Sequence, residues 1–130
     1  MEMTAKKILI IDDDKRTLEM AAKLLEPRGF AVVTYGGKFD RLNFVVRNKP
    51  DLVLLGVNMP FLAGDELFKL FADHPSLKDI PVAYFSSNDE ASLRLMVIQT
   101  GAAGYISKSE MGADFAGKVA RILDRVERKR

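Results

Sequence analysis

The chain alternates five times between a short apolar run and a longer segment whose apolar residues recur at helical spacing. This alternation is typical of a parallel β-sheet covered by helices on both faces, because parallel strands need a crossover connection between them. The expected strands are residues 7–11, 30–35, 51–57, 81–85 and 104–106. We therefore predict an α/β domain with five strands and five helices.

The expected helices are marked by apolar residues three or four positions apart, which would form one buried face. The first helix stops near residues 27–29, and the fourth covers residues 90–100. The residues expected on the buried faces of all helices but the fourth are Leu18, Ala21, Ala22 and Leu25 in the first, Phe39, Leu42, Val45 and Val46 in the second, Leu67, Phe68, Leu70 and Phe71 in the third, and Phe115, Val119, Ile122, Leu123 and Val126 in the fifth.

Length and composition exclude several classes of function. A chain of 130 residues fits one domain with its own core, so we expect a single domain over residues 1–130. Cysteine is absent and His74 is the single histidine, which argues against thiolate metal sites and a serine–histidine triad. The formal charge of +2 favours no nucleic-acid partner. No apolar stretch is long enough to span a bilayer, so we expect a cytoplasmic protein without membrane contact.

The carboxyl ends of the expected strands carry the chemistry. Three strands run into reactive or charged groups, which are Asp12, Asp13 and Asp14 after the first, Ser86 after the fourth, and Lys108 after the fifth. These ends meet at one edge of a parallel sheet, where carboxylates suit Mg²⁺ and a hydroxyl and an ammonium suit phosphoryl oxygens. The central strand ends in Gly56, which has no side chain. The predicted site is therefore built around a missing nucleophile.

This set of residues resembles the receiver domain of two-component response regulators, the chemotaxis-Y-like family, over nearly the whole chain. The stretches that carry the resemblance are residues 8–14, 50–55, 58–60 with Gly64, 80–82 and 101–108. The resemblance implies a flavodoxin-like, doubly wound sheet of five parallel strands in the order 2-1-3-4-5, with five helices. It also implies a bacterial phosphorelay signalling module rather than an enzyme.

The functional residues of the receiver family map onto positions of this chain one by one. The resemblance implies that Asp12, Asp13 and the backbone carbonyl of Asn58 are Mg²⁺ ligands. It makes Ser86 the switch hydroxyl, Tyr105 the switch aromatic residue and Lys108 the lysine that pairs with the phosphoryl group. The phosphoacceptor aspartate of the family maps to Gly56.

Gly56 is the decisive departure from the family. An acyl phosphate needs a carboxylate, and Asp51 lies too far away, at the opposite end of the same strand. Losing one carboxylate also lowers the affinity for Mg²⁺, so we expect no required cofactor and at most weak Mg²⁺ binding, with Lys108 as the counterion of Asp12 and Asp13. We therefore expect a pseudo-receiver, held in one conformation, that acts by phosphorylation-independent protein–protein interaction.

Two further departures flank the site. Ser109 stands where the family usually has a proline joined to the switch lysine by a cis peptide, so we expect a trans peptide. After Pro60 the family usually has glycine and aspartate, whereas this chain has Phe61-Leu62-Ala63. Phe61 and Leu62 would either plug the vacated pocket or form a partner patch.

The fourth expected helix also carries candidate interface residues. Residues 95–98 are four consecutive apolar positions, which an amphipathic helix cannot bury completely. Leu95, Met96 and Ile98 are therefore interface candidates, on the face of helix 4, strand 5 and helix 5 that the family uses for dimers and partners. The partners we expect are another signalling protein, a fused effector domain, or a second copy bound through this face.

Two other functions stay open on the sequence. The first is a phosphorylated switch that uses Asp13, Asp14 or Ser86 as its acceptor. The second is a phosphatase resembling haloacid dehalogenases, because Asp12 and Asp14 have the Asp-x-Asp spacing and are followed by Ser86 and Lys108. Against the phosphatase, the chain is short and has no late acidic pair and no cap domain.

Overall fold

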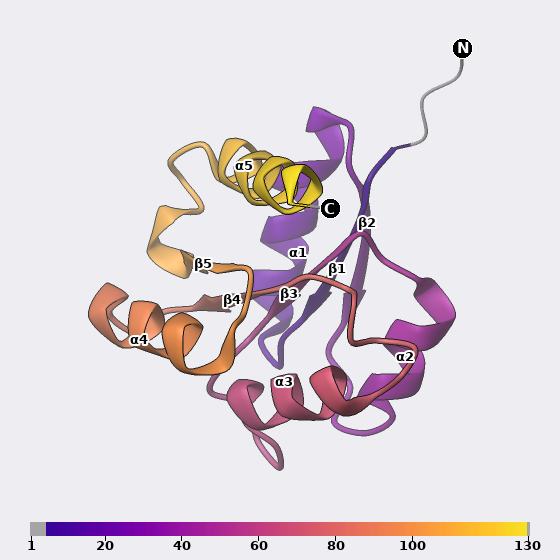
Figure 1. Cartoon of the computed structure of the whole chain (residues 1–130). Coiled ribbons are helices and arrows are strands. Elements are labelled where there is room, and N and C mark those ends of the chain that lie inside the picture. The colour runs from indigo at the N-terminus through magenta and orange to yellow at the C-terminus, as the bar shows by residue number, and fades with distance from the viewer. Residues whose placement is uncertain (1–4, 130) are drawn as a thin grey trace.

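The computed structural model describes residues 5–129 (Figure 1). The strands are β1 (Lys7–Ile11), β2 (Ala31–Tyr35), β3 (Leu52–Leu55), β4 (Val82–Ser86) and β5 (Gly104–Ser107). The helices are α1 (Lys15–Leu25), α2 (Arg41–Asn48), α3 (Gly64–Asp73), α4 (Glu90–Thr100) and α5 (Phe115–Arg128), with 3₁₀ turns at Glu26–Arg28 and Lys108–Glu110. The ends of the expected domain, at residues 1–4 and 130, lie outside the described residues.

The five strands are parallel and form one sheet in the order β2-β1-β3-β4-β5, which confirms the predicted topology. Figure 1 shows α1 and α5 on one face of this sheet and α2 and α3 on the other. Alternate strand residues point to the two faces. Ile10 and Leu54 therefore join the core beneath α1 and α5, whereas Ile11 and Leu55 join the core beneath α2, α3 and α4.

The strand register places the candidate site residues at one edge of the sheet. Ile11 pairs with Leu55, so the residues that follow them, Asp12 and Gly56, are neighbours. Ser86 pairs with Ser107 across β4 and β5, and Lys108 follows directly. Among residues 5–129, no helix is both long and apolar enough to cross a membrane.

Three aspartates cap the helices that follow β1, β4 and the turn after β5. Asp14 accepts a hydrogen bond from the Arg16 amide at 3.0 Å, and Asp89 accepts one from the Ser92 amide at 2.7 Å. Asp114 accepts one from the amide of Gly117 at 3.2 Å. A carboxylate at this position satisfies an unpaired amide of the first helical turn and interacts favourably with the helix dipole.

Several expected positions differ in the structure. Phe39 was expected on the buried face of the second helix, but it precedes α2 and is 72% exposed, because the chain turns at Asp40 with a left-handed φ of 63°. The buried position at the start of α2 is taken by Arg41. Leu70 is also exposed, at 44%, and Ala22 is only partly buried. The strand and helix order is as predicted, and the bounds of α4 are confirmed.

Candidate functional site

A small cavity of about 120 Å³ lies at the carboxyl end of the sheet. Its lining contains the residues that the sequence placed there, except Asp14 and Tyr105. The lining residues are Asp12, Asp13, Gly56, Val57, Asn58, Met59, Ser86, Ser87 and Lys108. The structure therefore brings together side chains from the ends of β1, β3, β4 and β5, as the sequence predicted.

An ion pair between Asp12 and Lys108 closes one side of this cavity. The Lys108 Nζ atom lies 2.7 Å from Oδ2 of Asp12, and the two side chains are 22% and 1% exposed. Oδ2 of Asp12 is fully buried and accepts no hydrogen bond of good geometry. The other oxygen, Oδ1, accepts a hydrogen bond from the Asp14 amide at 2.9 Å. Lys108 is thus the counterion of Asp12, as expected, but it forms no ion pair with Asp13.

Gly56 is buried beside this ion pair. Its amide donates a hydrogen bond to the Ile11 carbonyl at 2.8 Å, so the backbone continues the pairing of β1 and β3. A Cβ atom at this position would lie 2.9 Å from Oδ2 of Asp12 and 3.3 Å from Cγ of the same residue. The Asp12 carboxylate therefore stands against the space that a side chain at residue 56 would enter.

The turn after β3 packs tightly on the same backbone. The Gly64 amide donates a hydrogen bond to the Val57 carbonyl at 2.9 Å. A Cβ on Gly64 would collide with the carbonyl oxygen of Gly56, which requires a glycine at residue 64. The start of α3 is therefore held against the end of β3, which fixes the cavity wall.

Asn88 is a residue of the site that the sequence analysis did not single out. The backbone amide of Asn88 donates a hydrogen bond to Oγ of Ser86 at 3.1 Å, and Ser86 is 2% exposed. The Asn58 side-chain amide donates a hydrogen bond to Oδ1 of Asn88 at 2.6 Å. Asn88 thus connects the turns after β3 and β4. No family motif named it, and only its place two residues after Ser86 could have indicated it.

The three aspartates after β1 have different surroundings. Asp12 is buried in the ion pair, whereas Asp13 is exposed and lines the cavity. Asp14 accepts a hydrogen bond from the Thr17 hydroxyl at 3.0 Å, in addition to its capping bond. The Thr17 hydroxyl, followed by backbone amides of the first turn, holds the pKa of Asp14 below its ordinary value of 3.8. The Asp14 side chain therefore caps α1 and does not line the cavity.

Tyr105 lies outside the cavity. Its ring is half-buried, and its hydroxyl donates a hydrogen bond to Oε1 of Glu90 at 3.4 Å. The turn after Lys108 contains no cis peptide among the described residues, so the predicted trans peptide before Ser109 is confirmed. Oγ of Ser109 lies 2.8 Å from Oγ of Ser107, and this contact shapes the turn.

The candidate interface residues divide into exposed and half-buried ones. Leu95 and Ile98 are 52% and 77% exposed, which confirms that part of the apolar run on α4 faces outward. Phe61 is 72% exposed. Met96 and Leu62 are partly buried and pack against the core beneath α3 and α4. Neither Phe61 nor Leu62 lines the cavity, so the idea that they plug it is wrong.

Comparison with known proteins identifies the family. Residues 8–120 match the response regulator receiver domain. The protein RcaC of Microchaete diplosiphon is 31% identical over 120 residues, covering 92% of this chain and 18% of that protein. The phosphate regulon transcriptional regulatory protein PhoB of Klebsiella pneumoniae is 28% identical over 122 residues, covering 94% of this chain and 53% of that protein.

Solved structures show the same architecture. A receiver domain protein (CheY-like) from Methanospirillum hungatei superposes with a TM-score of 0.83 at 23% identity, covering 98% of this chain and 100% of that one. This likeness supports the fold, whereas the match of residues 8–120 covers the site itself. The chain spans about half or less of the length of the curated relatives described above. On these grounds, the chain belongs to the family of response regulator receiver domains.

Proposed function

We propose that this protein is a pseudo-receiver, a cytoplasmic interaction module of a two-component pathway that works without aspartyl phosphorylation at residue 56. One observation carries the proposal. Gly56 offers no nucleophile, and Oδ2 of Asp12 lies 2.9 Å from the place of its absent Cβ, held there by Lys108. Formation of an acyl phosphate needs a carboxylate nucleophile, and residue 56 at the end of β3 supplies none.

Without a phosphoryl group, no ligand biases the receiver between two conformations. The Lys108–Asp12 ion pair ties the turn after β5 to the end of β1. Ser86 is already engaged by the amide of Asn88, and Tyr105 by Glu90. These contacts favour one persistent state, so the surfaces of the domain are presented to partners constitutively.

We further propose that Mg²⁺ binding is weak and not required. Of the two carboxylates that line the cavity, Asp12 already has a counterion in Lys108, and Asp13 is exposed. Over the described part of the chain, no group of three or more histidine, cysteine, aspartate or glutamate side chains is placed to hold a metal ion. Mg²⁺ prefers an octahedral set of oxygen ligands, which these residues do not complete.

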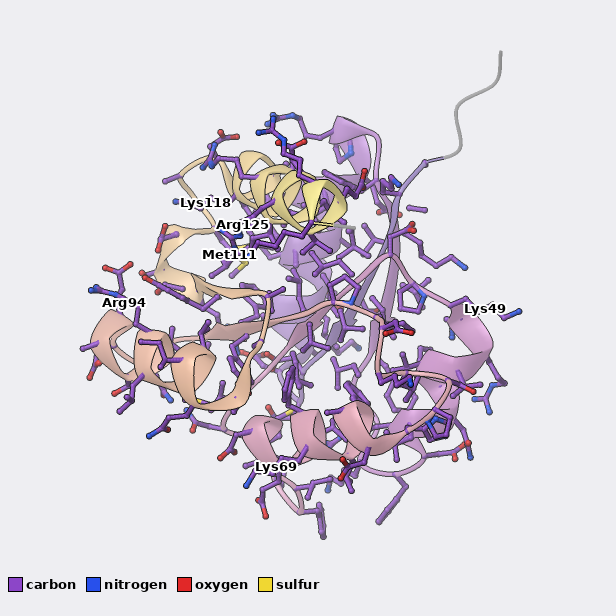
Figure 2. All side chains as sticks on the ribbon, viewed as in Figure 1. Lys49, Lys69, Arg94, Met111, Lys118 and Arg125 are labelled. Carbon is purple, nitrogen blue, oxygen red and sulfur yellow. The ribbon has the colours of Figure 1, made fainter. Side chains whose placement is uncertain are left out.

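The proposed partner surface is the face formed by α4, β5 and α5. It contains a groove of about 650 Å³ whose wall includes exposed Ile98 and several basic side chains. Figure 2 places Arg94 on α4, and Lys118 and Arg125 on α5, around this face. We propose that the face binds another signalling protein, a fused effector domain or a second copy of the chain. The domain binds no nucleic acid itself.

The experiment is incubation of the protein with acetyl phosphate and Mg²⁺, followed by intact-mass measurement. The proposal predicts no phosphoryl adduct, and the variant Gly56→Asp serves as the positive control. A stoichiometric adduct on the wild-type chain, stable in acid and labile in base, would overturn it.

A second candidate function is a switch phosphorylated at another residue. Asp13 is the acceptor that the structure favours, because it is exposed at the cavity, whereas Asp14 caps α1 and Ser86 is buried. Peptide mapping of an adduct to Asp13 would establish this function. The phosphatase alternative has less support, since Asp12 is buried against Lys108 and Asp14 caps a helix. Hydrolysis of small phosphate esters by the protein in the presence of Mg²⁺ would support the phosphatase alternative.

A further inference from the structure

An exposed aromatic pair lies beside α2 and α3, away from the face of α4, β5 and α5. Phe39 and Phe61 are each 72% exposed, and their ring centroids are 5.8 Å apart. Leu70, on α3, is 44% exposed. We call Lys38, Phe39, Phe61 and Leu70 the aromatic surface. Most of it borders a groove of about 370 Å³, whose lining also includes Asp40, Arg41 and Leu62.

Phe61 combines a strained backbone with an exposed ring. The φ angle of Phe61 is 71°, in the left-handed region that glycine adopts freely and bulky residues rarely adopt. This conformation is unfavourable for a non-glycine residue, because it brings Cβ too close to the following carbonyl oxygen. Phe61 also leaves most of its apolar area in water. Two unfavourable features at one residue are expected where the residue serves a function other than stability.

Arg41 holds the two aromatic loops together. Arg41 is 4% exposed, and its Nε donates a hydrogen bond to the Gly37 carbonyl at 3.0 Å. Its Nη1 donates another to the Leu62 carbonyl at 3.4 Å. One buried guanidinium thus connects the loop before α2 with the loop before α3. Because each loop carries one ring, the aromatic pair is preorganised, which lowers the entropic cost of binding.

The charges around the groove define what it would accept. The Lys38 Nζ atom lies 5.2 Å from the centroid of the Phe61 ring, and Lys38 forms no ion pair with any described residue. The one carboxylate in the lining, Asp40, is engaged by Asn43 at 2.6 Å and by Arg47 at 3.7 Å. The surface therefore combines uncovered apolar area with a positive charge that has no carboxylate partner among the described residues.

We propose that the aromatic surface is a docking site for a segment of another protein that presents an aliphatic or aromatic side chain next to an acidic one. The apolar side chain would pack on the two rings and enter the groove, whose volume suits a few side chains. The neighbouring carboxylate would pair with Lys38. This proposal does not depend on residue 56 or on whether the cavity at the carboxyl end of the sheet binds a ligand.

The test is selection of a random short-peptide phage library on the full chain, followed by fluorescence anisotropy with the selected peptides. We expect a consensus of an apolar residue flanked by aspartate or glutamate. Phe39→Ser and Phe61→Ser should each weaken binding by at least about tenfold, as loss of an aromatic anchor does at other interfaces. Lys38→Glu should also weaken it. Thermal unfolding verifies that the variants fold.

The matched control is Ile98→Ser, because Ile98 is 77% exposed and lies on α4. This variant should bind the selected peptides as tightly as the wild type. The proposal is overturned if no acidic–apolar consensus emerges, or if the peptides bind Phe61→Ser unchanged. It is also overturned if only Ile98→Ser loses binding, or if the wild type self-associates through Phe61, which would make a second copy the occupant.

Discussion

Restoring an aspartate at residue 56 should lower the stability of the metal-free protein and make it sensitive to Mg²⁺. The new Cβ would lie 2.9 Å from Oδ2 of Asp12, so the Asp12 carboxylate would have to shift within its contact to Lys108. Two carboxylates about 4 Å apart repel by roughly 4 kcal/mol at an effective dielectric constant near 20. Attraction of the new carboxylate to Lys108 offsets about half of this, and the lower entropy of the unfolded chain offsets about 0.5 kcal/mol more.

The net expectation is a loss of about 1–2 kcal/mol in the free energy of unfolding of Gly56→Asp at neutral pH and low salt. The assay is urea denaturation followed by circular dichroism, with and without Mg²⁺. Mg²⁺ at about 100 times its dissociation constant should return about 2.7 kcal/mol. Gly56→Asn has a similar shape without the charge, so it should lose less stability and show no response to Mg²⁺. Equal unfolding midpoints for the two variants, both insensitive to Mg²⁺, would refute the reasoning.

Four further predictions address other parts of the structure. Lys108→Ala should lower the free energy of unfolding by about 3 kcal/mol, because it leaves the buried Asp12 carboxylate unpaired, and adding Asp12→Asn should recover part of the loss in the same urea assay. Arg41→Ala should cost about 2 kcal/mol by leaving two carbonyls without their donor, and Arg41→Lys should not restore it. Phe61→Gly should be about 1 kcal/mol more stable than Phe61→Ala, since both lose the ring but only alanine keeps the left-handed strain; equal stabilities would contradict that strain. Hydrogen bonds from the Ser92 amide and then the Ser92 hydroxyl hold the pKa of Asp89 below its ordinary value of 3.8. The stabilising contribution of Asp89 is therefore complete above the unfolded pKa and is lost as the pH falls through the depressed value. The unfolding temperature of the wild type should fall more steeply than that of Asp89→Asn between about pH 5 and pH 3.

The sequence predicted the sheet and the residues at its carboxyl edge because both depend on local signals. Each strand is a run of apolar residues, and the polar groups that line the cavity directly follow these runs. The bounds of α4 were also predictable, since Asp89 caps its start and Gly101 ends it with a φ of 81°. The topology then places Asp12 and Lys108 at the same edge of the sheet, with β3 and β4 between their strands, and the long Lys108 side chain completes the contact.

The aromatic surface was not predictable because it depends on contacts between distant segments. Phe39 has helical spacing with the residues of α2, but the turn at Asp40 starts the helix later and leaves the ring outside. The buried guanidinium of Arg41 finds one of its two carbonyl partners, that of Leu62, in a loop twenty-one residues further along the chain. The left-handed backbone of Phe61 overrides the ordinary preference of a phenylalanine. Local sequence patterns do not contain information about contacts between segments that are far apart in the chain.

The most direct test of the pseudo-receiver is the amide NMR spectrum of the wild-type protein with and without acetyl phosphate and Mg²⁺. A single persistent conformation predicts unchanged resonances for Ser86, Tyr105 and Lys108, because no acyl phosphate forms at residue 56. Gly56→Asp should show shifts at these residues under the same conditions. New resonances for Ser86, Tyr105 and Lys108 in the wild type, appearing with acetyl phosphate and disappearing as it is consumed, would contradict the proposed function.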